Sequence, residues 1–197
     1  MNAHPARAGR LIIGVDGGGT KTSAVLAELD SDGQPRILAR GHSGPSNMRL
    51  AGQRRALASL GEALAPAREI LAERGGPADI AVLALAGSGY DDVQATIRSW
   101  ADEHCLCRRL EIISDAAPVL AAGTPGRWGV ALVVGTGSVA VGVDRQGWSI
   151  TRGGWGHWHA VGGVAAVGGA VGVSAVAAVG AAPAAVAGVA IGAVPAV

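Results

Sequence analysis

Apolar and polar positions divide the first part of the chain into short strand-like runs and one long helical stretch. Apolar runs at residues 11–16, 23–29 and 36–41 are separated by turn-forming residues, which predicts three successive strands. Leucines then recur at helical spacing over residues 49–74, and Pro66 is expected to kink or split that helix. Gly75, Gly76 and Pro77 should end it.

Strands and helices alternate in the next segment. Residues 80–86 are expected to form a buried strand, and Asp91 or Asp92 can cap the helix that follows. One face of that helix carries apolar residues at Val93, Ile97, Trp100 and Ala101. A strand over 110–113 and a short helix over 116–122 complete the order β-β-β-α-β-α-β-α, which predicts an α/β fold with parallel additions to a meander.

The pattern restarts after a Gly/Pro break at residues 123–126. Strands are expected at 128–134, 139–143 and 148–151, with a glycine turn between the first two. This second group of three strands with its own glycine turn indicates a weak internal repeat. The expected organisation is a loose arm (1–10), a first domain (11–124), the start of a second domain (125–157) and a tail (158–197).

The tail differs from the rest of the chain in composition. No acidic residue follows Asp144 and no arginine follows Arg152, and residues 160–197 contain only Ala, Val, Gly, two Pro, one Ser and one Ile. Such low complexity is untypical of a globular enzyme, so we expect a truncation or a reading-frame change near residues 157–160. A disordered or aggregation-prone extension and a membrane span are the alternatives.

Charge and cysteine content narrow the classes of function. The formal net charge of +1 argues against a dedicated nucleic-acid surface, which would be basic. No apolar segment typical of a signal peptide follows Met1, and Cys105 and Cys107 are too few for a disulfide framework. A cytoplasmic protein is therefore expected.

The most informative segment is Asp16-Gly17-Gly18-Gly19-Thr20-Lys21-Thr22, which follows a buried strand. Its glycines leave backbone N–H groups open to an anion and allow positive φ. Asp16 could hold Mg²⁺, and Lys21 is the single lysine of the chain. The spacing is not that of a Walker A loop, and a strand rather than a helix follows. An ordinary glycine-rich hairpin is the alternative.

Other segments could add to a phosphate and sugar site. Gly135-Thr136-Gly137-Ser138 is a second turn whose N–H and hydroxyl groups could face phosphates. Asp115 follows a strand, where it could accept a proton as a general base or cap the next helix. Asn47 could cap a helix or bond a sugar hydroxyl, and Gly153-Gly154-Trp155 could form a stacking platform for a sugar.

Together these motifs resemble the N-acetylglucosamine kinases of the BadF/BadG/BcrA/BcrD ATPase group, within the sugar kinase, actin and Hsp70 superfamily. They occur in the order Asp16–Thr22, Gly44–Asn47, Ser114–Ala116, Gly135–Ser138 and Gly153–His157. The resemblance covers residues 11–157 and implies ribonuclease-H-like domains that close on ATP and a sugar. The implied reaction is phosphoryl transfer from ATP to the 6-hydroxyl of an amino sugar.

The resemblance also implies roles for individual residues. Gly17, Gly18, Gly19, Thr20 and Lys21 would bind the ATP phosphates together with Gly135, Thr136, Gly137 and Ser138. Asp16 would hold Mg²⁺ and Asp115 would be the general base. The sugar would lie at Asn47, Asp115, Gly153, Gly154 and Trp155. The expected partners are ATP and the amino sugar, with no nucleic acid or membrane, and a homodimer is left open.

The chain departs from the family after His157, where members usually continue into a Leu-Gly-Asp-Glu-Gly-Ser segment and the rest of the second domain. Here the apolar tail begins instead. Two hypotheses follow from this difference. The chain is an amino-sugar kinase impaired by loss of its second domain, or it is a non-catalytic fragment that binds phosphate or a partner.

Overall fold

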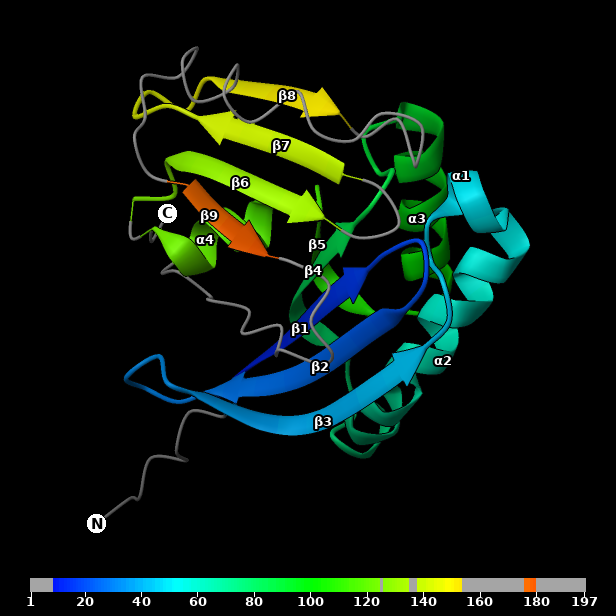
Figure 1. The fold of residues 1–197 in the computed structure, drawn as a ribbon. Helices are drawn as coiled ribbons and strands as arrows, with labels where there is room; N and C mark the ends of the chain where they lie inside the picture. Colours follow the sequence, from blue (N-terminus) through cyan, green and yellow to red (C-terminus); the bar gives the residue numbers. More distant parts are fainter. Residues whose placement is uncertain (1–8, 125, 135–137, 154–175, 180–197) are drawn as a thin grey trace.

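The computed structural model describes residues 9–124, 126–134, 138–153 and 176–179. They form two sheets with helices against each, as Figure 1 shows. The first sheet has the strand order β3-β2-β1-β4-β5 and the second the order β8-β7-β6-β9. This arrangement confirms the α/β fold expected from the sequence.

The first sheet begins with the expected meander. β1 (Arg10–Gly17), β2 (Thr22–Leu29) and β3 (Pro35–Ser43) pair antiparallel in chain order. β4 (Ala78–Leu85) and β5 (Cys107–Ile113) are then added parallel beyond β1. The carboxyl ends of β1, β4 and β5 therefore meet at one edge, where ligand sites of α/β sheets gather.

Two helices cover one face of this sheet. α2 (Gln53–Glu73) and α3 (Asp91–Glu103) lie together on the same side of it in Figure 1. The core between them and the strands includes fully buried Ile13, Leu26, Leu60, Leu64 and Leu83. Each such side chain contributes about 1.5–3 kcal/mol of burial free energy, so this core fixes the strand ends that carry the site.

The long helical stretch breaks at a different residue from the one expected. α1 (Met48–Ala51) is separated from α2 by Gly52, whose φ is +80°, whereas α2 continues through Pro66. A glycine adopts this left-handed conformation without the steric cost that other residues carry. The expected helix end is confirmed, since α2 stops at Glu73 and Gly75 has a φ of +76°.

Two expectations about helix caps are wrong. Tyr90, not Asp91 or Asp92, is the N-cap of α3. Both aspartates lie in the first turn, where their negative charges interact favourably with the positive end of the helix dipole. α4 (Ala117–Gly123) has Ala116 as its N-cap, so Asp115 does not cap it. The buried face of α3 at Val93 and Ile97 is confirmed.

The second sheet repeats the start of the first. β6 (Gly129–Val134), β7 (Ser138–Val143) and β8 (Ser149–Gly153) form an antiparallel meander, and β9 (Val176–Val179) pairs parallel with β6. β4 pairs with β1 in the same way, which confirms the repeat in topology. β9 gives four tail residues a place in the sheet. α4 packs against this sheet through Leu120 and Ala131.

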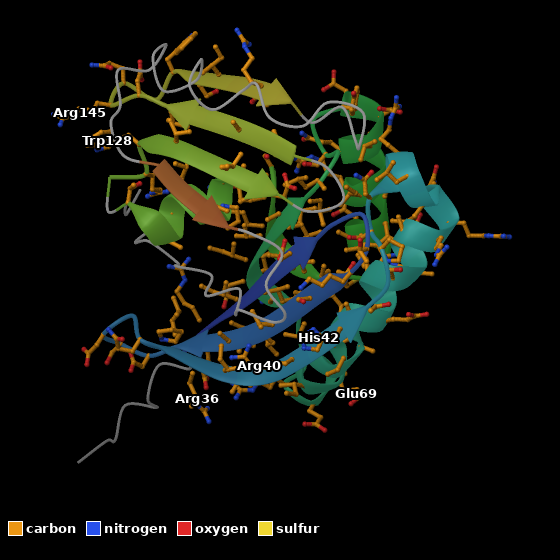
Figure 2. All side chains as sticks on the ribbon, in the orientation of Figure 1. Arg36, Arg40, His42, Glu69, Trp128 and Arg145 are labelled. Atoms are coloured by element: carbon orange, nitrogen blue, oxygen red, sulfur yellow. The ribbon has the colours of Figure 1, made fainter. Side chains whose placement is uncertain are left out.

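Polar side chains mark the outer parts of both sheets. Figure 2 shows Arg36, Arg40 and His42 along β3, an end strand of the first sheet. Charged side chains on an end strand disfavour pairing with another chain. In the second sheet, the guanidinium of Arg145 lies 4.5 Å from the ring centroid of Trp128, which ties the start of β6 to the β7–β8 turn (Figure 2).

Candidate phosphate and sugar site

The glycine turn, residues 17–21, joins β1 to β2 as expected. The Gly18 N–H donates to the Lys21 carbonyl at 2.9 Å and closes the hairpin, so this N–H is not open to an anion. None of Gly17, Gly18 and Gly19 has a positive φ. A Cβ at Gly17 would overlap the Ser46 hydroxyl and lie 2.5 Å from Cδ2 of Leu85. Close packing therefore requires glycine at position 17.

The β3–α1 loop is fastened to the glycine turn. The Gly18 carbonyl accepts hydrogen bonds from the N–H groups of Ser46 and Asn47, both at 3.1 Å. The buried Thr22 hydroxyl donates to the Gly44 carbonyl at 2.7 Å. The loop that carries Asn47 and the turn expected to hold phosphate thus form one hydrogen-bonded unit.

Asn47 has the cap position expected of it. Its Oδ1 accepts a hydrogen bond from the Arg49 N–H at 3.0 Å at the start of α1. Its amide also packs closely on Gly87, where an added Cβ would lie 2.9 Å from Oδ1. The side chain is therefore fixed between α1 and the turn that follows β4.

The turn after β4 was not expected to be part of the site. The Ala86 N–H donates to the Gly17 carbonyl at 2.8 Å, and the buried Ser88 hydroxyl donates to the Ile113 carbonyl at 3.1 Å. This turn therefore links the ends of β1 and β5. The sequence signal was the run of small residues from Ala86 to Gly89 directly after a buried strand. In the structure, Gly87 has a φ of +77° within this run.

Asp16 and Asp115 form an acidic pair at these strand ends. Asp16 is the last residue but one of β1, and Asp115 lies two residues beyond β5. Desolvation raises the pKa of Asp16, and the negative charge of Asp115 raises this pKa further, while Lys21 lowers it. Burial also raises the pKa of Asp115. The two carboxylates are therefore close enough to repel each other, although Asp16 keeps exposed surface.

Local hydrogen bonds orient Asp115. The Ser114 hydroxyl donates to Oδ1 of Asp115 at 3.3 Å and accepts from the Ala116 N–H at 3.2 Å. Hydrogen bonds from Ser114 and from the Asp115 and Ala116 N–H groups partly oppose the rise in the pKa of Asp115. The carboxylate is thus held at the end of β5 with its basicity increased, which suits a general base.

Several residues expected at the site lie outside the part of the chain that the structure describes: Gly135, Thr136, Gly137, Gly154 and Trp155. Ser138 begins β7 opposite Val134, and Gly153 ends β8 opposite Val139. The roles expected of this second group stay predictions. Within the described residues, no helix combines the length and apolar character needed to cross a membrane.

The first sheet, with a glycine turn between its antiparallel strands and an acidic pair at the ends of its parallel strands, defines an α/β domain of the ribonuclease-H-like, actin-like ATPase class. The chain belongs to the BadF/BadG/BcrA/BcrD ATPase family, whose sequence pattern matches residues 13–179. The match continues into the tail and includes β9.

Individual relatives agree with this assignment. The chain is 35% identical over 156 residues to the N-acetyl-D-glucosamine kinase of Dictyostelium discoideum, which covers 74% of the chain and 47% of the relative. It is 27% identical over 148 residues to the N-acetylmuramic acid/N-acetylglucosamine kinase of Clostridium acetobutylicum. That match covers 75% of the chain and 47% of the relative.

A solved structure shows the same fold. A Chromobacterium violaceum protein provisionally named an N-acetylglucosamine kinase is 30% identical, with a TM-score of 0.50 over 75% of the chain and 50% of that protein. The chain thus spans about half the length of the curated relatives that it matches.

Proposed function

We propose that the complete protein is an ATP-dependent amino-sugar kinase that phosphorylates the 6-hydroxyl of N-acetylglucosamine or a close relative. The observation that carries the proposal is the Asp16–Asp115 pair, held at the ends of β1 and β5 beside the glycine turn. The names of the relatives support the choice of amino sugar. N-acetylglucosamine, glucosamine and N-acetylmuramic acid are the substrates to compare.

The residues have separate tasks in this proposal. The glycine turn and Lys21 bind the phosphates of ATP, and Asn47 orients the sugar. Asp115 accepts the proton of the 6-hydroxyl as that oxygen attacks the γ-phosphorus, and ADP leaves. Phosphoryl transfer depends mainly on positioning and charge neutralisation, so the hydrogen bonds that fasten the β3–α1 loop and the strand ends beside the turn suit it.

The acidic pair also suits a divalent cation. Asp16 is partly exposed and stands close to a second carboxylate, and their repulsion disfavours the doubly ionised state without a cation. Mg²⁺ takes one or two carboxylates together with substrate phosphates. When bound, it would neutralise phosphate charge, with Asp16 as the residue that holds it.

Binding and turnover test the proposal separately. We expect the chain to bind ATP in a Mg²⁺-dependent manner in calorimetric titrations, and Asp16→Asn to lose the Mg²⁺ dependence. Asp115→Asn should still bind ATP. Absence of ATP binding by the wild-type chain would contradict the proposed site.

This polypeptide matches only about half the length of its two curated relatives. That share favours the alternative of a non-catalytic fragment when the chain is assayed alone. We therefore expect little or no phosphorylation of N-acetylglucosamine in an assay that couples ADP release to NADH oxidation. Turnover in the ordinary kinase range of about 1–100 s⁻¹, abolished by Asp115→Asn, would contradict this expectation and establish the kinase activity.

A further inference from the structure

The Ser46 hydroxyl is an unusual group in the candidate site. Ser46 is 2% exposed, and its Oγ is the one buried side-chain polar atom without a hydrogen-bond partner in the described part of the chain. A buried hydroxyl without a partner costs about 1–3 kcal/mol of stability. Such a group in a native fold needs a physical explanation.

Its position suggests that explanation. The hydroxyl lies directly against Gly17, so closely that a Cβ on Gly17 would overlap it. The backbone N–H of the same serine holds the Gly18 carbonyl at 3.1 Å. The main-chain N–H of Ser46 therefore holds the glycine turn, while its hydroxyl lies against the same turn without a hydrogen-bond partner.

The present shape of the turn is that of a closed hairpin. The Gly18 N–H is bonded to the Lys21 carbonyl rather than open to an anion. Backbone N–H groups bind phosphate only when they point at it. Phosphate binding through the Gly18 N–H thus requires this peptide group to reorient, and the Ser46 hydroxyl lies directly against the neighbouring Gly17.

We propose that Ser46 is a positioning residue for the phosphates of ATP: its hydroxyl, unpaired against the closed turn, gains a hydrogen bond to a backbone group of the turn when the turn reorients around phosphate. This inference rests on the proposed function. The hydrogen bond is formed only in the bound shape, so it contributes to ligand affinity rather than to the stability of the free protein.

Ser88 provides a matched control because it is also a buried serine, 4% exposed, but its hydroxyl is bonded to the Ile113 carbonyl. In thermal unfolding without ligand, Ser88→Ala should lower Tm, whereas Ser46→Ala should leave Tm unchanged or raise it. In calorimetric titrations, Ser46→Ala should weaken binding of Mg²⁺-ATP and of inorganic tripolyphosphate about two- to tenfold, as expected for one hydrogen bond.

The outcomes separate this inference from the proposed function. If Ser46→Ala lowers Tm as much as Ser88→Ala, the hydroxyl is already paired in the free protein and the inference is wrong. Unchanged affinity of Ser46→Ala for both ligands overturns it as well. In either case, ATP binding by the wild-type chain still supports the proposed site. A wild-type chain that binds neither ligand overturns both proposals.

Discussion

Removing the Thr22 hydroxyl should release the β3–α1 loop from the sheet. Thr22 is 1% exposed and donates to the Gly44 carbonyl at 2.7 Å, so Thr22→Val keeps the shape of the side chain and deletes this bond. The carbonyl of Gly44 then loses its partner, at a cost of about 1–3 kcal/mol. Because Gly44 is only half-buried and water can partly replace the hydroxyl, we expect about 1–2 kcal/mol.

Urea unfolding measures this loss directly. With an m value of about 1–3 kcal/mol/M, a loss of this size lowers the midpoint by roughly 0.3–2 M. Amide hydrogen exchange gives the local readout, because the N–H groups of Ser46 and Asn47 are protected by their bonds to Gly18. Exchange at both should accelerate about tenfold for each 1.4 kcal/mol of local destabilisation.

Thr22→Ser is the matched control, since it keeps the hydroxyl and deletes only a methyl group. Both variants can lower global stability, but only Thr22→Val should accelerate exchange at Ser46 and Asn47. A Thr22→Val protein within about 0.5 kcal/mol of wild type, the usual range of neutral substitutions, would refute the view that this bond anchors the loop. Equal acceleration in the two variants would refute it too.

Three further changes test other parts of the fold. Gly41→Ala places a Cβ into the carbonyl oxygen of Ala63 on α2, and we expect at least about 1–3 kcal/mol of destabilisation by calorimetry; near-wild-type Tm would contradict this packing. The Arg74 and Arg36 hydrogen bonds lower the pKa of Glu28 to about 2. The stability that Glu28 gains from the two arginines should therefore be present above about pH 4.5 and fade as the pH falls towards 2. Urea unfolding of Glu28→Gln and of the wild type should accordingly give free energies of unfolding that converge at low pH. Burial raises the pKa of Asp115, so its ionised form opposes folding. Asp115→Asn should therefore raise Tm at pH 7 but not below pH 3.8, the ordinary pKa of an aspartate. A lower Tm of this variant at pH 7 would contradict the view that burial destabilises the Asp115 carboxylate.

Local patterns were sufficient to predict most of the fold. Strands with continuous apolar runs, such as β1 and β4, were found within two residues of their ends, because burial on both faces leaves an unmistakable pattern. The break at Gly52 was not found, since it depends on one backbone angle rather than on composition. Pro66 does not split the helix, since α2 continues through it and packs on β3, where tertiary contacts can override a local preference against a helix interior.

The candidate site was only partly predictable. Asp16 and Asp115 stood out because each follows an apolar run, and the topology brings them together at one sheet edge. The contributions of Ser46 and Ser88 depend on which carbonyl or glycine each one meets across loops far apart in sequence. No periodicity carries that information, so only the three-dimensional structure reveals them.

β9 shows how little side-chain chemistry this edge of the second sheet needs. Its four residues, Val176–Val179, are only Val and Ala, and they pair parallel with β6 from Val130 to Val133. The sequence of β9 therefore brings no charge and no side-chain hydrogen-bonding group to this ladder. Main-chain hydrogen bonds and small apolar side chains are sufficient to add the strand.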